Sequence, residues 1–403
     1  MGRHIAFLNN SGYGHVIPTL DVVTELVRRG HRVSYVTAEG PARTVAAAGA
    51  TVVEYQSRLP ELDLAGIVNT PDGTARLPGI YLTEAEGILR AATAHFVADR
   101  PDLVVYDVTV YHAGRILSRA WGVPAAQFLP VFASNEHFSL LEKMFGKVDP
   151  AGLRHPELVA FFNRLRRLLA AYGQSDTALE EFIGRVEGLN LVGCPRSFQY
   201  AGDRFDDRFT FVGPSVGAGV DVGEWTPPGD GRPVLLVSLG TTVNRRPGFW
   251  ETCLAAFAEL PWHVVLATHD GVDGLGGAVP PNVEVRSWVP FLAVLEHAAV
   301  AITHGGFGSI MGALYQGTPV IVVPDSPEAR VNASRVAELG LGRVVRDGTL
   351  TAERLRGTVL DLAADQQTYR RVRDMRRDIR ETGGGPHGAD AIERYLTESR
   401  IVA

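Results

Sequence analysis

The chain has 403 residues, of which 45% are hydrophobic and 21% are charged, and its formal net charge at pH 7 is −6. This length favours two domains over one, and the composition is that of an ordinary globular protein. The negative charge balance provides no basic field for nucleic acid or for an anionic membrane surface, so both classes of partner are excluded.

Three further features of the sequence favour a cytoplasmic protein. The two cysteines, Cys194 and Cys253, lie far apart and form no metal-binding spacing, which is typical of reduced thiols. The chain enters an apolar strand within its first eight residues and lacks the layout of a signal peptide. No run of about 18 apolar residues is present, so no membrane-spanning helix is predicted.

The first half of the chain alternates short apolar runs with amphipathic segments, which is the pattern of parallel strands joined by helices. Strands are predicted over residues 4–8, 32–37, 51–55, 102–106, 124–128, 189–192 and 209–212. Helices are predicted over residues 18–30, 42–48, 83–100 and 112–121, and in part of the aromatic stretch 132–172. Residues 56–79 carry Pro60, Pro71 and Pro78 and are expected to form a surface loop.

A stretch rich in glycine and proline separates this half from a second half with the same alternation. Residues 213–232 hold six glycines and three prolines, which makes them the best linker candidate. After them, strands are predicted over residues 233–239, 263–267, 283–287, 300–303, 319–323 and 342–346. Helices are expected over residues 310–316, twice within 350–381, and over 389–399 after a break at 383–386. The predicted parts are a domain at 1–213, a linker at 214–232, a domain at 233–380 and a terminal helix in 381–403.

One stretch of the second half has the chemistry of a phosphate site. The strand predicted at 300–303 is followed by His304-Gly-Gly-Phe-Gly-Ser309 and then by a helix. A glycine-rich turn that opens a helix presents unpaired backbone N–H groups and the positive end of the helix dipole. His304 and Ser309 add side-chain donors. Upstream, Trp288 offers a flat face to a base, and Glu328, expected in a loop, is placed to meet sugar hydroxyls.

The first half contains a candidate acid–base pair. His15 follows the first strand, and a histidine near its ordinary pKa suits proton abstraction at neutral pH. Asp107 ends another strand of the same predicted sheet, where its carboxylate would orient the imidazole. The alternatives are a turn histidine that caps a helix and an aspartate that serves as an N-cap.

The order of motifs along the chain resembles that of nucleotide-sugar glycosyltransferases of the GT-B fold. It looks closest to the actinobacterial branch that modifies macrolides and related natural products. The motifs are Gly14-His-Val-Ile-Pro-Thr-Leu20, Val105-Tyr-Asp107, Trp121-Gly-Val-Pro124, Val237-Ser-Leu-Gly-Thr241 and the stretch 286–333. The resemblance implies two Rossmann-like parallel-sheet domains that face each other across a cleft, with the C-terminal helix packed back on the N-terminal domain.

The resemblance also implies roles for individual residues. His15 would be the catalytic base and Asp107 its partner. Acceptor contacts would come from the N-terminal domain, including Tyr13, Phe132 and Phe138. No metal and no cofactor is implied besides the nucleotide-sugar co-substrate. The donor would be bound by Ser238, Gly240, Thr241, Trp288, Val289, His304, Gly306, Gly308, Ser309 and Glu328.

The implied activity is that of a hexosyltransferase of antibiotic biosynthesis and secondary metabolism. The expected reaction is inverting, metal-independent transfer of a sugar, a deoxysugar from a dTDP donor or else a UDP-linked sugar, to a hydroxyl of a polyketide or macrolide aglycone. The expected partners are the nucleotide sugar and a small hydrophobic aglycone, with no nucleic acid and no stable membrane insertion. The protein would be a monomer or a homodimer. The alternative is a GT-B homologue without glycosyl transfer, acting as an auxiliary protein or catalysing other chemistry.

Three positions depart from the pattern of related uridine-nucleotide enzymes. Phe291 and Gly312 stand where those enzymes usually carry Gln and Glu, which hold the ribose hydroxyls. Ala329 stands where the family's Asp-Gln pair has its amide, after Glu328. Fewer polar partners suit a deoxyribose and a deoxysugar, because a site built around hydroxyls discriminates by pairing them. The departures at 291 and 312 therefore favour a dTDP-linked donor, and a site that has drifted from its ancestral donor is the alternative.

A dinucleotide-dependent oxidoreductase is the competing enzyme class. Its Gly-x-Gly-x-x-Gly fingerprint begins correctly at Gly12 and Gly14, but its third glycine would fall at Ile17. In the second half, Gly306 and Gly308 would require glycine at Met311. Both matches fail, so this class is disfavoured.

Overall fold

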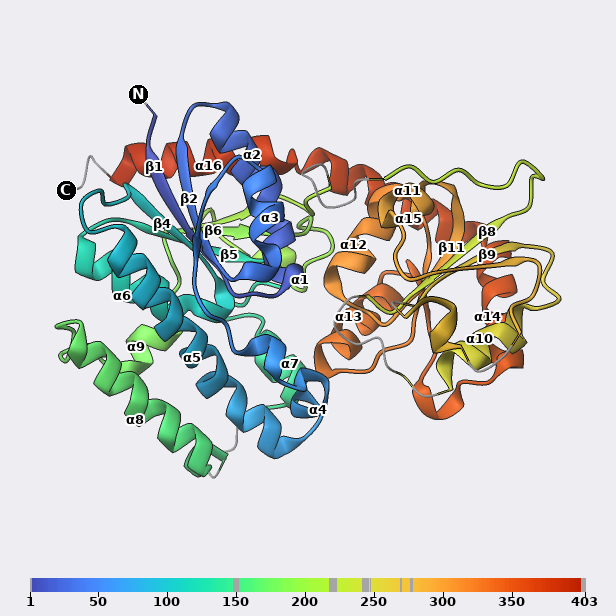
Figure 1. Ribbon diagram of the computed structural model, residues 1–403, viewed down its shortest axis with the longest axis horizontal. Helices are drawn as coiled ribbons and strands as arrows, with labels where there is room; N and C mark the ends of the chain where they lie inside the picture. The colour runs from blue at the N-terminus through green and yellow to red at the C-terminus, as the bar shows by residue number, and fades with distance from the viewer. Residues whose placement is uncertain are drawn as a thin grey trace. The chain divides into compact units, whose positions relative to one another are not determined.

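The chain folds as two compact α/β units (Figure 1). The computed structural model describes residues 2–147, 152–216, 223–240, 246, 248–268, 270–275 and 278–399. Unit 1 takes Met1–Val220 and Thr382–Ala403, and unit 2 takes Asp221–Glu381. Residues 217–222, in the middle of the predicted linker, lie outside the described residues. Within the described ranges, no helix is both long and apolar enough to cross a membrane.

Unit 1 is built on a seven-stranded parallel sheet in the order β3-β2-β1-β4-β5-β6-β7. The strands are β1 His4–Leu8, β2 Arg32–Thr37, β3 Thr51–Glu54, β4 Leu103–Asp107, β5 Ala125–Leu129, β6 Leu189–Val192 and β7 Phe209–Phe211. Its α-helices are α1 Tyr13–Val16, α2 Leu20–Arg28, α3 Glu39–Ala47, α4 Leu64–Val68, α5 Pro71–His95, α6 Tyr111–Trp121, α7 Leu140–Phe145, α8 Pro156–Ala171, α9 Leu179–Gly184 and α16 Gly384–Ser399.

Both faces of this sheet are buried, as a parallel sheet requires. Side chains alternate along β1, so Ile5 and Phe7 face α2, α3 and α16. Ala6 and Leu8 face the opposite layer of α5, α6 and α8. Each strand consequently reads as a continuous apolar run, which is why the sequence pattern found most of the strands.

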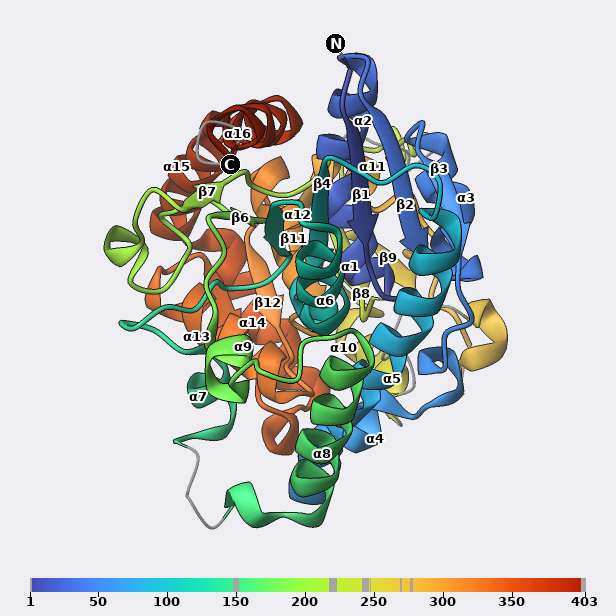
Figure 2. The same ribbon diagram turned by 90° about the vertical axis from the view of Figure 1, so that its left-hand side faces the viewer.

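The C-terminal helix packs on the first half of the chain, as the sequence analysis predicted (Figure 2). Two glycines of α16 permit this contact. A Cβ at Gly385 would lie 2.3 Å from the Asp21 carbonyl oxygen, and one at Gly388 would lie 2.6 Å from a Val22 methyl. At the edge of the contact, Arg29 pairs with Asp390 at 2.6 Å. The glycine-rich sequence before residue 389 therefore serves close helix packing.

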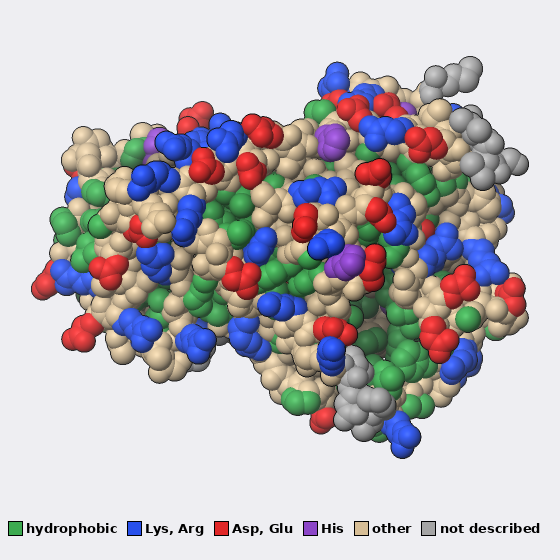
Figure 3. Space-filling model, turned by 180° about the vertical axis from the view of Figure 1, so that it is seen from behind, with side chains coloured by type: hydrophobic (Ala, Val, Ile, Leu, Met, Phe, Trp, Pro, Cys, Tyr) green, Lys and Arg blue, Asp and Glu red, His purple; other side chains and the backbone are tan. Residues whose placement is uncertain are grey.

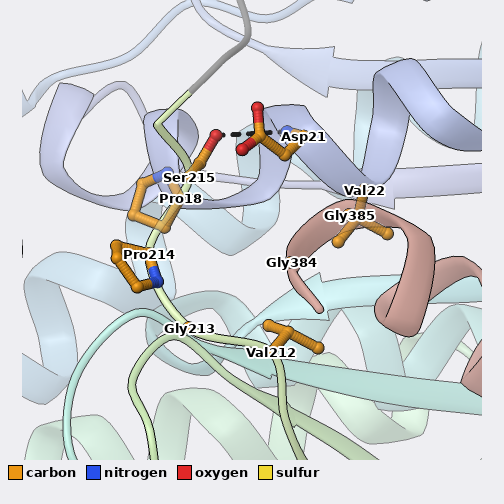
Figure 4. A pocket seen from close by; sticks show the side chains of 9 residues that line it. All are labelled: Pro18, Asp21, Val22, Val212, Gly213, Pro214, Ser215, Gly384 and Gly385. Atoms are coloured by element: carbon orange, nitrogen blue, oxygen red, sulfur yellow. Dashed lines mark hydrogen bonds between the residues drawn. The ribbon is translucent and has the colours of Figure 1, made fainter. Parts of the chain in front are cut away.

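The two points at which the chain leaves and re-enters unit 1 lie together at the start of α2 (Figure 4). The hydroxyl of Ser215 accepts a hydrogen bond from the Asp21 backbone N–H at 3.2 Å, and the Asp21 carboxylate accepts one from Val216 N–H at 2.9 Å. Thr382 donates from its hydroxyl to the Val212 carbonyl at 2.9 Å. Gly213, at φ +75°, makes the turn beside Thr382. Both crossing segments are thus hydrogen-bonded within unit 1.

Unit 2 is built on a six-stranded sheet in the order β10-β9-β8-β11-β12-β13, and all the pairs are parallel. Its strands are β8 Val234–Ser238, β9 His263–Ala267, β10 Val283–Arg286, β11 Ala298–Thr303, β12 Val320–Val322 and β13 Gly342–Val344. Its α-helices are α10 Phe249–Phe257, α11 Phe291–His297, α12 Phe307–Gln316, α13 Pro327–Glu338, α14 Ala352–Ala364 and α15 Gln366–Glu381. α10 and α14 cover one sheet face through a shared apolar core.

The surface loop predicted over residues 56–79 is wrong, because the structure has α4 and most of the first half of α5 there. Thr70 caps α5 by accepting a hydrogen bond from Gly73 N–H at 3.1 Å. Pro71 occupies the first helical turn, where no backbone N–H is required. Pro78 lies inside α5 and removes one backbone hydrogen bond. The packing of α5 on α6 and α8 outweighs that loss.

The helix break predicted at residues 383–386 is also misplaced. α16 begins at Gly384 and includes Pro386 in its first turn. The first N–H groups of a helix have no intrahelical partner, so a proline is tolerated there.

Charges of both signs are mixed on one face of the molecule. On the face shown in Figure 3, Lys and Arg side chains alternate with Asp and Glu side chains. This distribution agrees with the absence of a basic field in the sequence.

One buried histidine makes the stability of unit 1 sensitive to acid. His112 in α6 is 1% exposed, packs on Tyr111 and Phe161, and has no hydrogen-bond partner for either ring nitrogen among the described residues. Burial, and then the charge of Arg115, lower its pKa from 6.5 to about 3. The His112 ring therefore becomes protonated at a higher pH in the unfolded chain than in the folded chain.

We predict that the free energy of unfolding falls more steeply with acid in the native protein than in a His112→Phe variant. Above pH 6.5 the ring is neutral in both the folded and the unfolded chain. Below pH 6.5 the unfolded chain takes up a proton on His112 that the folded chain does not, so the free energy of unfolding falls by about 1.4 kcal/mol per pH unit. Urea unfolding of both proteins at pH 7, 6 and 5 measures the difference. Parallel pH dependences would contradict this prediction, whatever the absolute stability of the variant.

Candidate functional site

His15 and Asp107 meet at the carboxyl end of the unit 1 sheet. β1 pairs in parallel with β4, and the last register pair is Leu8 with Tyr106. The loop after β1 leads into α1, which carries His15, while Asp107 ends β4. His15 Nδ1 lies 2.9 Å from Asp107 Oδ2. The His15 side chain is 24% exposed and the Asp107 carboxylate is buried, so the imidazole separates the charge from solvent.

Asp107 also has the second role that the sequence left open. It is the N-cap of the short 3₁₀ helix Val108–Val110, because its Oδ1 accepts from Thr109 N–H at 2.8 Å. The Thr109 hydroxyl donates to the same oxygen. One oxygen of the carboxylate is thus used for capping and the other faces His15. For His15, the capping alternative is not seen, since it lies within α1, whose N-cap is Gly12, and the N-cap of the next α-helix, α2, is Thr19.

The backbone of His15 is held by Asn9. The Asn9 amide donates to the His15 carbonyl at 2.9 Å and contacts the Tyr35 hydroxyl at 2.9 Å. Asn9 is buried directly after β1. The loop therefore has a fixed shape where it carries the imidazole.

The residues expected to contact the acceptor differ in accessibility. Tyr13 is 41% exposed and donates its hydroxyl to the Gly40 carbonyl at 2.8 Å. It borders an open depression of about 550 Å³, which is also lined by Glu39, Gly40, Arg43 and Thr44. Phe138 is partly buried and stacks on Tyr200. Phe132 is buried beneath them against Phe198, so its ring supports the aromatic cluster and is not part of its surface.

In unit 2, two strands bring the predicted donor residues side by side. β8 and β11 are parallel neighbours, with Ser238 opposite Thr303. The Ser238 hydroxyl accepts from Gly240 N–H at 3.3 Å. The chain after β8 therefore lies beside the chain after β11, which carries His304. Thr241 lies outside the described residues.

The ring of His304 is enclosed by two glycines. A Cβ at Gly240 would lie 2.7 Å from His304 Cε1, and one at Gly306 would lie 2.7 Å from His304 Nε2. Between them, Gly305 adopts φ +100°, and its carbonyl accepts from the buried Asn332 amide at 2.9 Å. Burial, and then the charge of Arg246, lower the pKa of His304 from 6.5 to about 4. His304 is therefore neutral at pH 7.

The N-terminus of α12 follows directly after this turn. Gly306 is its N-cap, and no side chain caps the helix there. Gly308 is exposed, and a Cβ added to it would meet no atom of the described residues within 4 Å. Ser309 is partly buried in the same first turn. The uncapped N–H groups and the open space over Gly308 give this helix start the features of an anion site.

The remaining donor candidates lie farther along unit 2. Trp288, between β10 and α11, is 57% exposed, whereas Val289 beside it is buried. An indole face is thus available for stacking. Glu328 lies in the first turn of α13 and not in the expected loop, because Ser326 caps that helix by accepting from Ala329 N–H at 3.2 Å. The Ser-Pro pair at 326–327 was an N-terminal helix signal that the sequence analysis missed.

Sequence and structure comparisons agree over almost the whole chain. Residues 251–386 match the family described as "Erythromycin biosynthesis protein CIII-like, C-terminal domain". The chain is 36% identical to the demethyllactenocin mycarosyltransferase of Streptomyces fradiae, covering 98% of this chain and 87% of that protein. It is 35% identical to the oleandomycin glycosyltransferase of Streptomyces antibioticus, covering 98% and 91%. The crystal structure of a calicheamicin glycosyltransferase superposes with a TM-score of 0.86 at 42% identity over 99% of both chains.

The chain belongs to the family of natural-product glycosyltransferases. Its two parallel-sheet units are those of the GT-B fold, which confirms the resemblance inferred from the motifs. The protein is thus an enzyme, and the relatives favour this assignment over a homologue without transfer.

Two of the positions that depart from the family pattern contact each other in this glycosyltransferase. Gly312 in α12 faces α11, where an added Cβ would lie 3.2 Å from Leu292 and 3.5 Å from Phe291. Gly312 therefore packs against Leu292 and the Phe291 ring. Ala329 is buried near Gly305. The two positions that the sequence analysis linked through the ribose thus also lie together in the fold.

The analysis of the sequence missed Arg246 of the glycosyltransferase. Its guanidinium donates to the Val323 carbonyl at 3.0 Å, and its charge acts on His304. It places a fixed positive charge near the α12 turn. No local motif marks it, because it follows β8 by several residues and joins the site only through the fold.

We predict opposite effects on stability for two glycines at the start of α12. Gly306→Ala should lower the free energy of unfolding by ~1–3 kcal/mol, because its methyl group collides with the packed His304 ring. Gly308→Ala, the matched control, should leave it unchanged or raise it by up to ~1 kcal/mol, because its methyl group enters open space in a helix. Urea unfolding measures both, and equal stabilities would show that His304 is not held between the glycines.

Proposed function

We propose that this glycosyltransferase is an inverting, metal-independent enzyme that transfers a deoxysugar from a dTDP donor, or else a sugar from a UDP donor, to a hydroxyl of a polyketide or macrolide aglycone. The observation that carries the proposal is the 2.9 Å contact between His15 and the buried Asp107 carboxylate. Unit 1 would supply the base, and unit 2 would hold the nucleotide sugar.

The pair has the chemistry that glycosyl transfer to an alcohol requires. A proton on His15 Nδ1 is donated to Asp107, so the lone pair of the neutral imidazole is on Nε2. Nε2 would take the acceptor hydroxyl proton while the acceptor oxygen forms a bond to the anomeric carbon. The bond from that carbon to the diphosphate breaks, and its electron pair leaves with the nucleoside diphosphate. A single displacement of this kind inverts the anomeric centre, and Asp107 stabilises the imidazolium that forms.

The start of α12 supports the donor half of the proposal. Negative charge grows on the diphosphate as it leaves, and preorganised donors stabilise that charge. The N–H groups of Gly308 and Ser309 and a ring N–H of His304 would be such donors, and the nearby charge of Arg246 would add positive potential. They provide positive potential from the chain itself, which is the reason for proposing metal independence.

The proposed donor and acceptor classes rest on fewer observations. Phe291 and Gly312 form an apolar contact where related uridine-nucleotide enzymes have polar side chains, which favours a deoxyribose over a ribose. Among the relatives, one is a mycarosyltransferase and another an oleandomycin glycosyltransferase, which supports an antibiotic-type acceptor.

We predict that His15→Ala lowers kcat by ~100-fold or more, the usual contribution of a general base, while the affinity for the nucleotide changes little. Asp107→Asn should also lower kcat, because the amide no longer stabilises the imidazolium. Turnover is measured with excess EDTA, nucleotide affinity by calorimetry, and the anomeric configuration of the product by NMR coupling constants.

Each outcome addresses one part of the proposal. Wild-type turnover in His15→Ala would remove His15 from the mechanism. Loss of wild-type activity in EDTA would contradict metal independence, and a retained anomeric configuration would contradict the single displacement. Asn190→Ala is the control in unit 1, since it removes a buried side-chain hydrogen bond on β6 outside the proposed site, and it should keep kcat within a few fold of the wild type.

We predict that the wild-type protein binds dTDP more tightly than UDP or GDP in metal-free calorimetric titrations. The double variant Phe291→Gln/Gly312→Glu should shift the preference toward UDP, because it restores polar partners for the ribose hydroxyls. Gly312→Glu alone is a poorer test, since its side chain would meet Leu292 and Phe291. An unchanged dTDP/UDP ratio in a folded double variant would contradict the ribose argument.

A further inference from the structure

The contact between His15 and Asp107 lies beyond the end of the strand pairing that brings them near each other. The β1–β4 ladder ends at Leu8 and Tyr106. From there the two chains continue as separate loops, one toward α1 and one toward the 3₁₀ helix after β4. Side-chain contacts must therefore fix the position of one loop relative to the other.

Asn10 makes a side-chain bridge between these loops. Its Nδ2 group donates to the Thr109 hydroxyl at 2.7 Å, across 99 residues of sequence. Its Oδ1 atom accepts from Gly12 N–H at 2.6 Å, at the start of α1. Asn10 is 1% exposed, and its own backbone N–H is bonded to Asn9 Oδ1 at 2.8 Å. The amide thus connects the loop that carries His15 to the residue that caps Asp107.

The chemistry of the neighbours determines the direction of each bond. Gly12 N–H can only donate, so it must face the Asn10 oxygen. The Thr109 hydroxyl has one proton, which it donates to the Asp107 carboxylate, so it accepts from the Asn10 NH₂ group. An aspartate at position 10 would keep the first bond but could not donate the second. The bridge therefore requires an amide of this length.

We propose that Asn10 is a positioning residue of the catalytic pair: it holds the His15 loop against the Thr109–Asp107 cap and thereby sets the contact between the imidazole and the carboxylate. This inference rests on the proposed role of His15 as the base. Asn10 acts through Thr109 and the Gly12 backbone. Its loss frees the His15 loop from Asp107 while the strands stay paired.

The test compares Asn10→Ala with Asn190→Ala. Asn190 is an equally buried asparagine of unit 1, on β6, and its amide donates to the Glu187 carbonyl at 2.9 Å, remote in sequence from both loops. Both variants lose a buried amide, so both report the general cost to folding. Asn10→Asp is the second test variant, because it is isosteric, keeps the acceptor for Gly12 N–H and replaces the donor to Thr109 with a carboxylate oxygen.

For Asn10→Ala and Asn10→Asp, kcat should fall on the order of 10-fold or more, part of the ~100-fold or larger effect of a general base. KM for the nucleotide sugar should stay within about 2-fold, because that site is in the other unit. In Asn10→Ala the acid limb of kcat against pH should differ from that of the wild type, because the imidazole loses its fixed contact with the Asp107 carboxylate. Asn190→Ala should keep the wild-type kcat and pH profile.

A spectroscopic measurement separates this inference from the proposed function. NMR of the imidazole in the substrate-free protein reports the Nδ1–H bond to Asp107 through its downfield proton and its tautomer. Loss of that signal in Asn10→Ala, but not in Asn190→Ala, supports the positioning role. An unchanged signal, kcat and pH profile in folded Asn10→Ala would overturn it. Full turnover in His15→Ala would overturn the proposed base instead and would leave the NMR comparison valid.

Discussion

The parallel pairing of β1 with β4 is the constraint on which the proposed chemistry of unit 1 depends. It places the ends of two strands, far apart in sequence, at one edge of the sheet. Asp107 is buried there, and a buried carboxylate is tolerated only when hydrogen bonds replace its hydration. Thr109 satisfies one oxygen and His15 the other. The position of His15 is therefore fixed both by its hydrogen bond to the buried carboxylate and by the conformation of its own loop.

The same geometry recurs in unit 2 with different chemistry. β8 and β11 end side by side at Ser238 and Thr303, as β1 and β4 do in unit 1. Here the chain places glycines where unit 1 places polar side chains. Gly240 and Gly306 leave space for the His304 ring, and burial keeps that ring neutral. One sheet edge thus holds an imidazole paired with a carboxylate, and the other holds an uncharged imidazole beside a helix start.

Much of this arrangement could be predicted from the sequence, because parallel strands buried on both faces give continuous apolar runs. β2, β6 and β9 begin and end at the predicted residues. The first part of α5 was missed because prolines suggested a loop, whereas tertiary packing decided the outcome; the rest of α5 overlaps the helix predicted over residues 83–100. His15 and Asp107 were candidates because each follows a strand. Asn10, Thr109 and Arg246 gave no such signal, since their partners are chosen by contacts between residues far apart in the chain.

Helix α12 carries two glycines on which the proposed donor recognition depends. Gly308 and Gly312 are four residues apart and so lie on one face of the helix. The first is open, and the second is covered by Leu292 and Phe291 of α11. A side chain at position 312 would pack against these two residues. We therefore expect the proposed nucleotide preference to depend on residues 291 and 312 together.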